Sequence, residues 1–194
     1  MLLIIDNQSA YIKKFQRNYL ADQDFEIISM DHNQPLILPH EVNIQGVILS
    51  GGRGSPYEPL NLTTNFIALM NFDVPILGLC LGHEIIAVAN RGRIKKLQKY
   101  NNKKEVVRIQ SLEDPIFEGT HENEVSLIKK HNYYVAQTPV NFISLGESDT
   151  CPNEIIRHNE KMIYGFQSHP EVSGLQGLKM MVNFLKMCGL PAEL

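Results

Sequence analysis

The ten residues PILGLCLGHE, at positions 75–84, decide how this chain folds. An apolar run leads into Cys80, which has one glycine two residues before it and another two residues after it. The spacing G-x-C-x-G is typical of a sharp turn from strand to helix, because glycines remove the Cβ atoms that would clash there. We therefore predict a strand over 74–79 and a helix over 82–90, with Gly92 just beyond its end.

Strand-like and helix-like segments also alternate before this turn. The segments are, in order, 2–6 (strand), 9–22 (helix), 25–30 (strand), 46–52 (strand) and 61–71 (helix). Ser9 is the expected N-cap of the first helix, and a threonine or asparagine that of the second. Near-continuous apolar strands separated by helices predict an α/β protein with a parallel sheet covered on both faces.

The second half of the chain has a different pattern. Most of its segments are short and extended, and a final helix is predicted over 174–189. The extended candidates are 104–110, 123–130, 141–148, 153–158 and 161–170. Functional groups of open α/β sheets collect beyond the carboxyl ends of the strands, which favours the loops 50–55, 80–83 and 168–172 as the site.

Composition limits the classes of protein to consider. A chain of 194 residues suits a single domain over 1–194, and 43% hydrophobic with 20% charged residues is an ordinary globular balance. A net charge of −3 argues against nonspecific binding to nucleic acid or to an anionic membrane, and no apolar run could span a bilayer. Three cysteines without a Cys-x-x-Cys pair indicate a reducing, cytoplasmic setting.

The local sequence leaves three possible roles for Cys80: a buried hydrophobic residue, a metal ligand or a nucleophile. A helix that starts beside the sulfur favours thiolate, as a nucleophile requires. A zinc site with His83 would need further ligands at suitable spacing, and no such set is found, so no metal site is predicted. His83 itself is better explained by local packing in the following helix.

A cysteine nucleophile needs a base and a group that orients the base, and FQSHPEV (166–172) offers both. If Pro170 keeps this segment extended, His169 and Glu171 point to the same face and can share a hydrogen bond. The alternative is a surface histidine followed by a solvated glutamate. Glycines in LSGGRGSPYEP (49–59) could supply a backbone N–H to an oxyanion hole, although a phosphate loop or a flexible turn would look similar.

Together these motifs resemble the class I, or triad, glutamine amidotransferases. VILSGG, PILGLCLGHE and YGFQSHPEV occur in the order of that family, followed by a closing helix. The resemblance implies a flavodoxin-like three-layer sandwich, with a mainly parallel sheet and extra antiparallel strands in the second half. It also implies catalysis by Cys80, His169 and Glu171, with Gly52 and Leu81 as oxyanion donors.

The resemblance further implies substrate contacts from Glu84 and from KKHNYYV (129–135), at Asn132 and Tyr133. Three departures from the family pattern stand out: GGRGSP replaces the usual G-G-P, Ser168 replaces an aromatic residue, and Glu84 replaces a glutamine. An ionised carboxylate accepts hydrogen bonds but cannot donate them. Glu84 would then either favour the ammonium group of the substrate or repel its carboxylate.

Within the family, the segments 114–119, 144–174 and 183–189 most resemble the separate glutaminase subunits of GMP synthases. The resemblance implies an ATP-pyrophosphatase synthetase partner that aminates XMP and carries ATP and Mg, with no cofactor in this chain. The alternatives are the glutaminase components of anthranilate or aminodeoxychorismate synthase, a cysteine peptidase or γ-glutamyl hydrolase on the same fold, and a non-catalytic regulatory or binding subunit that has kept the fold. The basic stretch at 91–104, with seven Lys or Arg residues, is either a solvated face or a docking patch for the partner.

Overall fold

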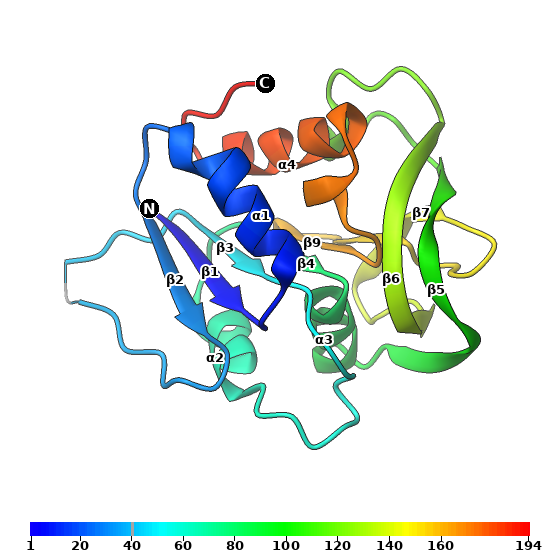
Figure 1. Ribbon diagram of the computed structural model, residues 1–194, viewed down its shortest axis with the longest axis horizontal. Coiled ribbons are helices and arrows are strands. Elements are labelled where there is room, and N and C mark those ends of the chain that lie inside the picture. Colours follow the sequence, from blue (N-terminus) through cyan, green and yellow to red (C-terminus); the bar gives the residue numbers. More distant parts are fainter. Residues whose placement is uncertain (40) are drawn as a thin grey trace.

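The computed structural model describes residues 1–39 and 41–194, whose strands form one nine-stranded sheet (Figure 1). The strand order is β2-β1-β3-β4-β9-β8-β7-β5-β6. The first five of these strands run parallel, and every later neighbour is antiparallel. The parallel strands are β1 (Leu2–Asp6), β2 (Ile27–Asp31), β3 (Gly46–Leu49), β4 (Ile76–Leu79) and β9 (Ile163–Phe166). The others are β5 (Arg93–Ile109), β6 (Glu124–Gln137), β7 (Phe142–Glu147) and β8 (Ile155–His158).

Helices cover both faces of the parallel half, which confirms the predicted three-layer sandwich (Figure 1). Leu2 and Ile4 of β1 pack in the core that contains α1 (Ala10–Asn18) and α4 (Leu175–Met187). Leu3 and Ile5 point the other way, into the core that contains side chains of α2 (Thr63–Asn71) and α3 (Leu81–Ala89). Alternate residues of one strand therefore fill two separate cores, which is why the strand is apolar throughout.

The local signals at the helix ends are partly confirmed. Ser9 caps α1 as predicted, and its hydroxyl accepts the N–H groups of Tyr11 and Ile12. The cap predicted for α2 is wrong in position, because the N-cap is Leu62, which makes no side-chain capping bond. Asn61 still contributes, since its Oδ1 accepts the N–H of Thr63 at 3.4 Å.

The antiparallel strands β5 and β6 are longer than the sequence predicted. The basic stretch 91–104 forms most of β5, and 131–137 continues β6, so the two strands pair as a long ribbon with an irregularity between Lys96 and Asn101. The sequence did not predict the full length of these strands, because both sides of the ribbon carry polar or basic side chains and the alternation of apolar residues is weak. The ribbon brings residues of β6 over the carboxyl ends of β4 and β9.

Close packing of α3 on the sheet depends on glycine. A Cβ atom at Gly82 would collide with the backbone carbonyl of Leu49, and one at Gly78 would collide with the carbonyl of Gly82. The two glycines of the opening motif thus let the helix lie directly on β3 and β4. Three short 3-10 turns complete the secondary structure: η1 (Leu20–Asp22), η2 (Pro115–Phe117) and η3 (Pro170–Val172). Across the two described ranges, no helix has the length and apolar character needed to cross a lipid bilayer.

Candidate active site

Cys80 occupies the predicted turn between β4 and α3. Its backbone has φ 50° and ψ −101°, a conformation that non-glycine residues rarely adopt and that is kept only where the surroundings enforce it. One restraint is the hydrogen bond from its N–H to the carbonyl of Phe166, at 2.7 Å. The turn places the thiol at the N-terminus of α3, and the Cys80 side chain lines a cavity.

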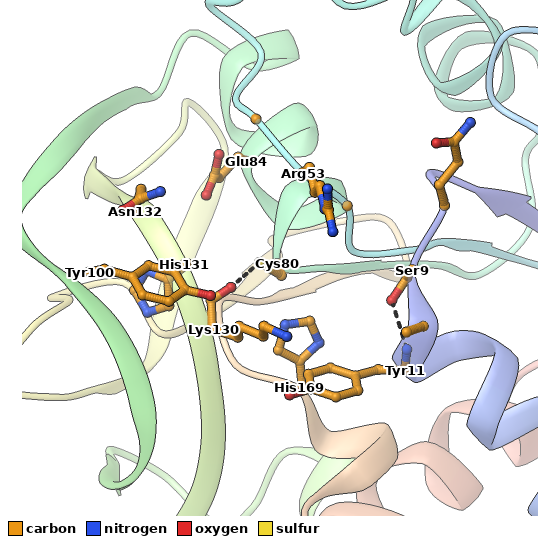
Figure 2. Close-up of a pocket in the computed structure, with 14 residues that line it drawn as sticks. Ser9, Tyr11, Arg53, Cys80, Glu84, Tyr100, Lys130, His131, Asn132 and His169 are labelled. Atoms are coloured by element: carbon orange, nitrogen blue, oxygen red, sulfur yellow. Dashed lines mark hydrogen bonds between the residues drawn. The ribbon is translucent and has the colours of Figure 1, made fainter.

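The surroundings of the Cys80 sulfur favour the thiol over the thiolate. Burial, with added effects of the carboxylates of Glu84 and Glu171, raises the pKa of the Cys80 thiol well above its ordinary value, although the backbone N–H of Leu81 acts in the opposite sense. The S–H group donates to the carbonyl oxygen of Lys130, at 3.8 Å (Figure 2). Burial and the nearby carboxylates therefore act against the helix terminus, which by itself favours the thiolate.

His169 and Glu171 meet as the sequence predicted, but by a different backbone path. Nδ1 of His169 lies 2.8 Å from Oε1 of Glu171, and both residues are buried. The expected extended segment is wrong: Pro170 begins the turn η3, and His169 has φ −115° and ψ 75° just before it. The tight turn folds the carboxylate back onto the imidazole. Donation from Nδ1–H to the carboxylate leaves Nε2 as the ring atom available to accept a proton.

A glycine brings the imidazole and the thiol residue close together. A Cβ atom at Gly51 would lie 2.9 Å from Cε1 of His169 and 3.5 Å from Cβ of Cys80. The backbone N–H of His169 also donates to the carbonyl of Ile128 in β6, at 2.8 Å. The carboxyl ends of β3, β4 and β9 thus contribute one site, as expected of an open α/β sheet.

These residues surround a cavity of about 630 Å³ (Figure 2). Of the residues named from sequence, five line this cavity: Gly52, Cys80, Glu84, Asn132 and His169. The lining also includes residues that sequence reasoning did not name, among them Tyr11, Arg53, Tyr100, Lys130 and His131. Leu81, Tyr133 and Glu171 are not among its lining residues, so each would have to act through its backbone or through a neighbour.

The two predicted oxyanion donors are neighbours, since a Cβ atom at Gly52 would lie 2.8 Å from Cδ2 of Leu81. Gly52 packs tightly, since a Cβ atom there would lie 2.5 Å from the carbonyl oxygen of Asn7, and its loop is fixed by the hydrogen bond from Asn7 N–H to Ser50 Oγ at 2.8 Å. The longer GGRGSP loop turns outward at Gly54, which has φ 87°, and exposes Arg53 at the cavity. The side chain of Leu81 faces a second, smaller pocket.

The segment 129–135 lies in β6 and reaches the cavity through Lys130, His131 and Asn132. Nδ1 of His131 lies 2.6 Å from the carbonyl oxygen of Tyr133, while Nε2 is buried without a hydrogen-bond partner. Burial lowers the pKa of His131 to about 4, so Nδ1–H is the donor and Nε2 keeps its lone pair. Tyr133 points its hydroxyl away to Glu58, at 3.1 Å.

Lys129 holds this part of β6 in place through buried ion pairs. Its ammonium group is fully buried and pairs with Glu154 and with Glu105, the latter at 3.0 Å. Ser148 and Thr150 complete the shell around the ammonium. A buried charge cluster of this kind fixes the position of the strand, because each charge would be costly without its partners.

Tyr11 is a site residue that the sequence did not indicate. Its ring packs edge-on against the imidazole of His169, with 4.7 Å between the ring centroids. The ammonium of Lys130 lies 5.4 Å from the centroid of the same tyrosine ring (Figure 2). The only sequence signal is its place just after β1, whose carboxyl end adjoins that of β3.

His83 points away from the cavity. It is fully buried in α3, and a Cβ atom at Gly165 in β9 would collide with its Nδ1. Burial lowers the pKa of His83 to about 3, so the imidazole is neutral. Among the described residues, no group of three or more His, Cys, Asp or Glu side chains is arranged to hold a metal ion.

Comparisons with known proteins cover nearly the whole chain. The family model "Glutamine amidotransferase class-I" matches residues 3–188. A subunit of the glutamine-hydrolyzing GMP synthase of Pyrococcus abyssi is 35% identical over 195 residues, which are 97% of this chain and 99% of that protein. The subunit of the same name from Methanococcus aeolicus is 33% identical over 198 residues, at 100% coverage of both chains.

A solved structure from Thermoplasma acidophilum has the same fold, with a TM-score of 0.81 at 24% identity over 97% of this chain and 93% of that one. The solved structure shows only a shared fold, whereas the family model and the two relatives show membership of a family. Because they match nearly the whole chain, this chain belongs to the class-I glutamine amidotransferase family, as its motifs predicted.

Proposed function

We propose that this protein releases ammonia from glutamine by covalent catalysis at Cys80. The observation that carries the proposal is the strained turn that presents Cys80 to the same cavity as His169, whose ring is held by Glu171 at 2.8 Å. A nucleophile, a base and a group that orients the base are the parts needed for attack on an amide carbon.

The proposed reaction has two halves. Sγ of Cys80 attacks the side-chain amide carbon of glutamine while Nε2 of His169 accepts the thiol proton. The C–N bond then breaks as the imidazolium gives this proton to the leaving nitrogen, which yields ammonia and a γ-glutamyl thioester. His169 next accepts a proton from water as the water oxygen attacks the thioester carbon. The C–S bond then breaks, the imidazolium returns the proton to Sγ of Cys80, and glutamate leaves.

Backbone N–H groups of Gly52 and Leu81 would stabilise the tetrahedral oxyanion. Glu84 and Asn132 are proposed to contact the substrate directly, since both line the cavity. For Tyr133 we propose a backbone role, because its carbonyl orients the imidazole of His131.

The state of Cys80 in the isolated chain supports the proposal that glutaminase activity depends on a partner protein. A thiol of raised pKa, bonded to the carbonyl of Lys130, has to leave that acceptor before His169 can take its proton. A small shift of β6 would achieve this. We therefore expect weak glutaminase activity in the isolated chain and a large increase when a synthetase partner docks.

For the ammonia acceptor we propose XMP. The relatives named as GMP synthase subunits match the whole chain, and the word subunit implies a second component. In this proposal a cytoplasmic ATP-pyrophosphatase partner binds ATP, Mg and XMP, receives the ammonia and forms GMP. The exposed Lys95 and Lys96 of β5 are proposed as part of its docking surface.

The test is glutamate release by wild type and Cys80→Ala, with and without the synthetase partner and its nucleotides. We expect loss of activity in Cys80→Ala under every condition and a sharp rise in wild type with the partner, ATP and XMP. Activity in Cys80→Ala would overturn the mechanism. Stimulation by a chorismate-using partner, but not by the XMP-using one, would overturn the proposed acceptor. Charge reversal at Lys95 and Lys96 should weaken partner binding in a titration without loss of folding.

A further inference from the structure

Glu84 is a carboxyl group buried in a substrate cavity without a counter-charge. Glu84 is 2% exposed, and Figure 2 shows its side chain projecting from α3 toward the strand that carries Asn132. Oε1 accepts a hydrogen bond from Nε2 of Gln167 at 3.1 Å, while Oε2 is buried and has no partner. Within residues 1–39 and 41–194, no cationic side chain forms an ion pair with it.

The hydrogen bonds show which oxygen can carry a proton. Oε1 of Gln167 accepts the backbone N–H of Val135 at 3.2 Å, and because a backbone N–H can only donate, the orientation of this amide is fixed. Gln167 must therefore offer an N–H group to Oε1 of Glu84. Because Oε1 already accepts this N–H group, a proton on Glu84 resides on Oε2, which makes Oε2 an O–H donor.

The charges around Glu84 support the neutral form. Burial raises its pKa to about 8, the hydrogen bond from Gln167 lowers it, and the carboxylate of Glu58 raises it further. The neighbouring thiol of Cys80 and hydroxyl of Tyr133, whose pKa values are both raised, supply no positive charge that would favour an ionised Glu84.

The cavity lining adds two cations, Arg53 and Lys130, and two imidazoles, His131 and His169. Arg53 is solvated, and the ammonium of Lys130 lies against the ring of Tyr11. Neither cation forms an ion pair with Glu84, so burial and the carboxylate of Glu58 act on Glu84 without a compensating positive charge.

A second unpartnered atom in the cavity has the opposite character. Nε2 of His131 is a buried acceptor, because Nδ1–H is used by the carbonyl of Tyr133. The cavity therefore presents one O–H donor and one nitrogen lone pair. An α-amino acid head carries the matching groups: a carboxylate that accepts hydrogen bonds and an ammonium that donates them.

We propose that Glu84 binds glutamine as a neutral carboxylic acid, donating from Oε2 to the α-carboxylate, while Nε2 of His131 accepts from the α-ammonium group. Glu84 lies one helical turn beyond Cys80, and its N–H donates to the Cys80 carbonyl at 3.0 Å. One turn of helix rises about 5.4 Å, similar to the distance between the amide carbon and the head of an extended glutamine. This inference rests on the proposed function, since it places the amide at Cys80.

The proposal predicts a pH dependence of glutamine binding. Ionisation of Glu84 removes the donor and places a negative charge beside the substrate carboxylate. Apparent affinity falls with the fraction of binding-competent protein, so the Kd should rise about tenfold between pH 7 and pH 9. Cys80→Ala protein is the right background, because it lacks the proposed nucleophile and has no thiol in the cavity to titrate.

The experiment is a calorimetric titration of glutamine into Cys80→Ala protein, with the synthetase partner present, from pH 6 to pH 9.5. Adding Glu84→Gln should reduce the alkaline rise in Kd to the part caused by deprotonation of the substrate's own ammonium group, because an amide donates at every pH. Adding Glu84→Ala should weaken binding throughout. Adding Glu58→Gln is the matched control: it should move the rise to slightly lower pH without removing it. A Kd independent of pH in the Cys80→Ala protein, or an equal rise after Glu84→Gln, would overturn the inference.

A second measurement separates the inference from the proposed function. Infrared spectroscopy of the wild-type protein at pH 7 should show a protonated carboxyl band that is absent from Glu84→Gln. Absence of this band overturns the inference even if glutamine binds. Absence of glutamine binding at every pH, with the band present, would instead count against glutamine as the substrate and leave the neutral donor established.

Discussion

Glu84→Gln should stabilise the protein, by an amount that depends on pH. The carboxyl of Glu84 has a pKa of about 8 in the folded protein against an ordinary value of 4.5, because burial penalises its charged form. Between these two values the folded chain binds one more proton than the unfolded chain at this site. The contribution of Glu84 to the stability is therefore fully present below pH 4.5 and is lost as pH rises toward 8.

The magnitude follows from the size of the pKa shift. Each pH unit in this window costs the wild type about 1.4 kcal/mol of unfolding free energy relative to a side chain that does not titrate. Glutamine has nearly the same shape and keeps the hydrogen bond from Gln167. The gain from Glu84→Gln should therefore be below about 1 kcal/mol at pH 5, about 3 kcal/mol at pH 7, and nearly constant above pH 9.

Urea unfolding of both proteins at half-unit steps from pH 5 to pH 9 measures this difference, since all other titrating groups cancel in the comparison. Glu113→Gln, at an exposed position, is the matched control and should give a difference close to zero at every pH. A gain from Glu84→Gln that stays constant between pH 5 and pH 8 would show that the carboxyl is ionised in the folded state, and would refute the reasoning.

Three further substitutions test other parts of the structure. Gly82→Ala should destabilise the protein by several kcal/mol in urea unfolding, because the new Cβ collides with a backbone carbonyl of β3; a change below about 0.5 kcal/mol would contradict this packing. Lys129→Ala should cost about 3–5 kcal/mol, since it leaves Glu154 buried without its cation, and an unchanged midpoint would argue against the ion pair. Tyr11→Leu should lower kcat for glutamine hydrolysis more than it changes KM, because the ring contacts His169; equal effects on both would indicate a role in binding instead.

The strands and helices of the parallel half were predictable because their signals are local. Continuous apolar runs at 2–6 and 74–79 indicated buried parallel strands, and glycines around Cys80 indicated the strand-to-helix turn. The β5–β6 ribbon was predicted too short, since its apolar alternation is interrupted by basic residues at 95–104. Such a ribbon is held by pairing between distant segments, which no local window reports.

For the site, the motifs alone identified Cys80, His169 and Glu171 as candidates, because each belongs to a short pattern with its own geometry. The tertiary structure decided how they meet. His169 and Glu171 contact through the turn η3 rather than along an extended chain, and β6 supplies the acceptor for the thiol from Lys130. Lys130 is 50 residues from Cys80 in the chain, and the proximity of such distant segments depends on the strand order of the sheet.

Glu84 is the clearest example of a property that the sequence did not predict, namely the protonation state of a side chain. Position 84 could be read from the motif, and the ordinary chemistry of glutamate made it an ionised, acceptor-only group. Only the tertiary structure encloses it, fixes the amide of Gln167 through Val135 and leaves it without a cation, which makes the neutral donor the stable form. The sequence thus identified the catalytic candidates and position 84, while the tertiary structure added Tyr11, Lys130 and His131 to the site, and burial decided where the protons are.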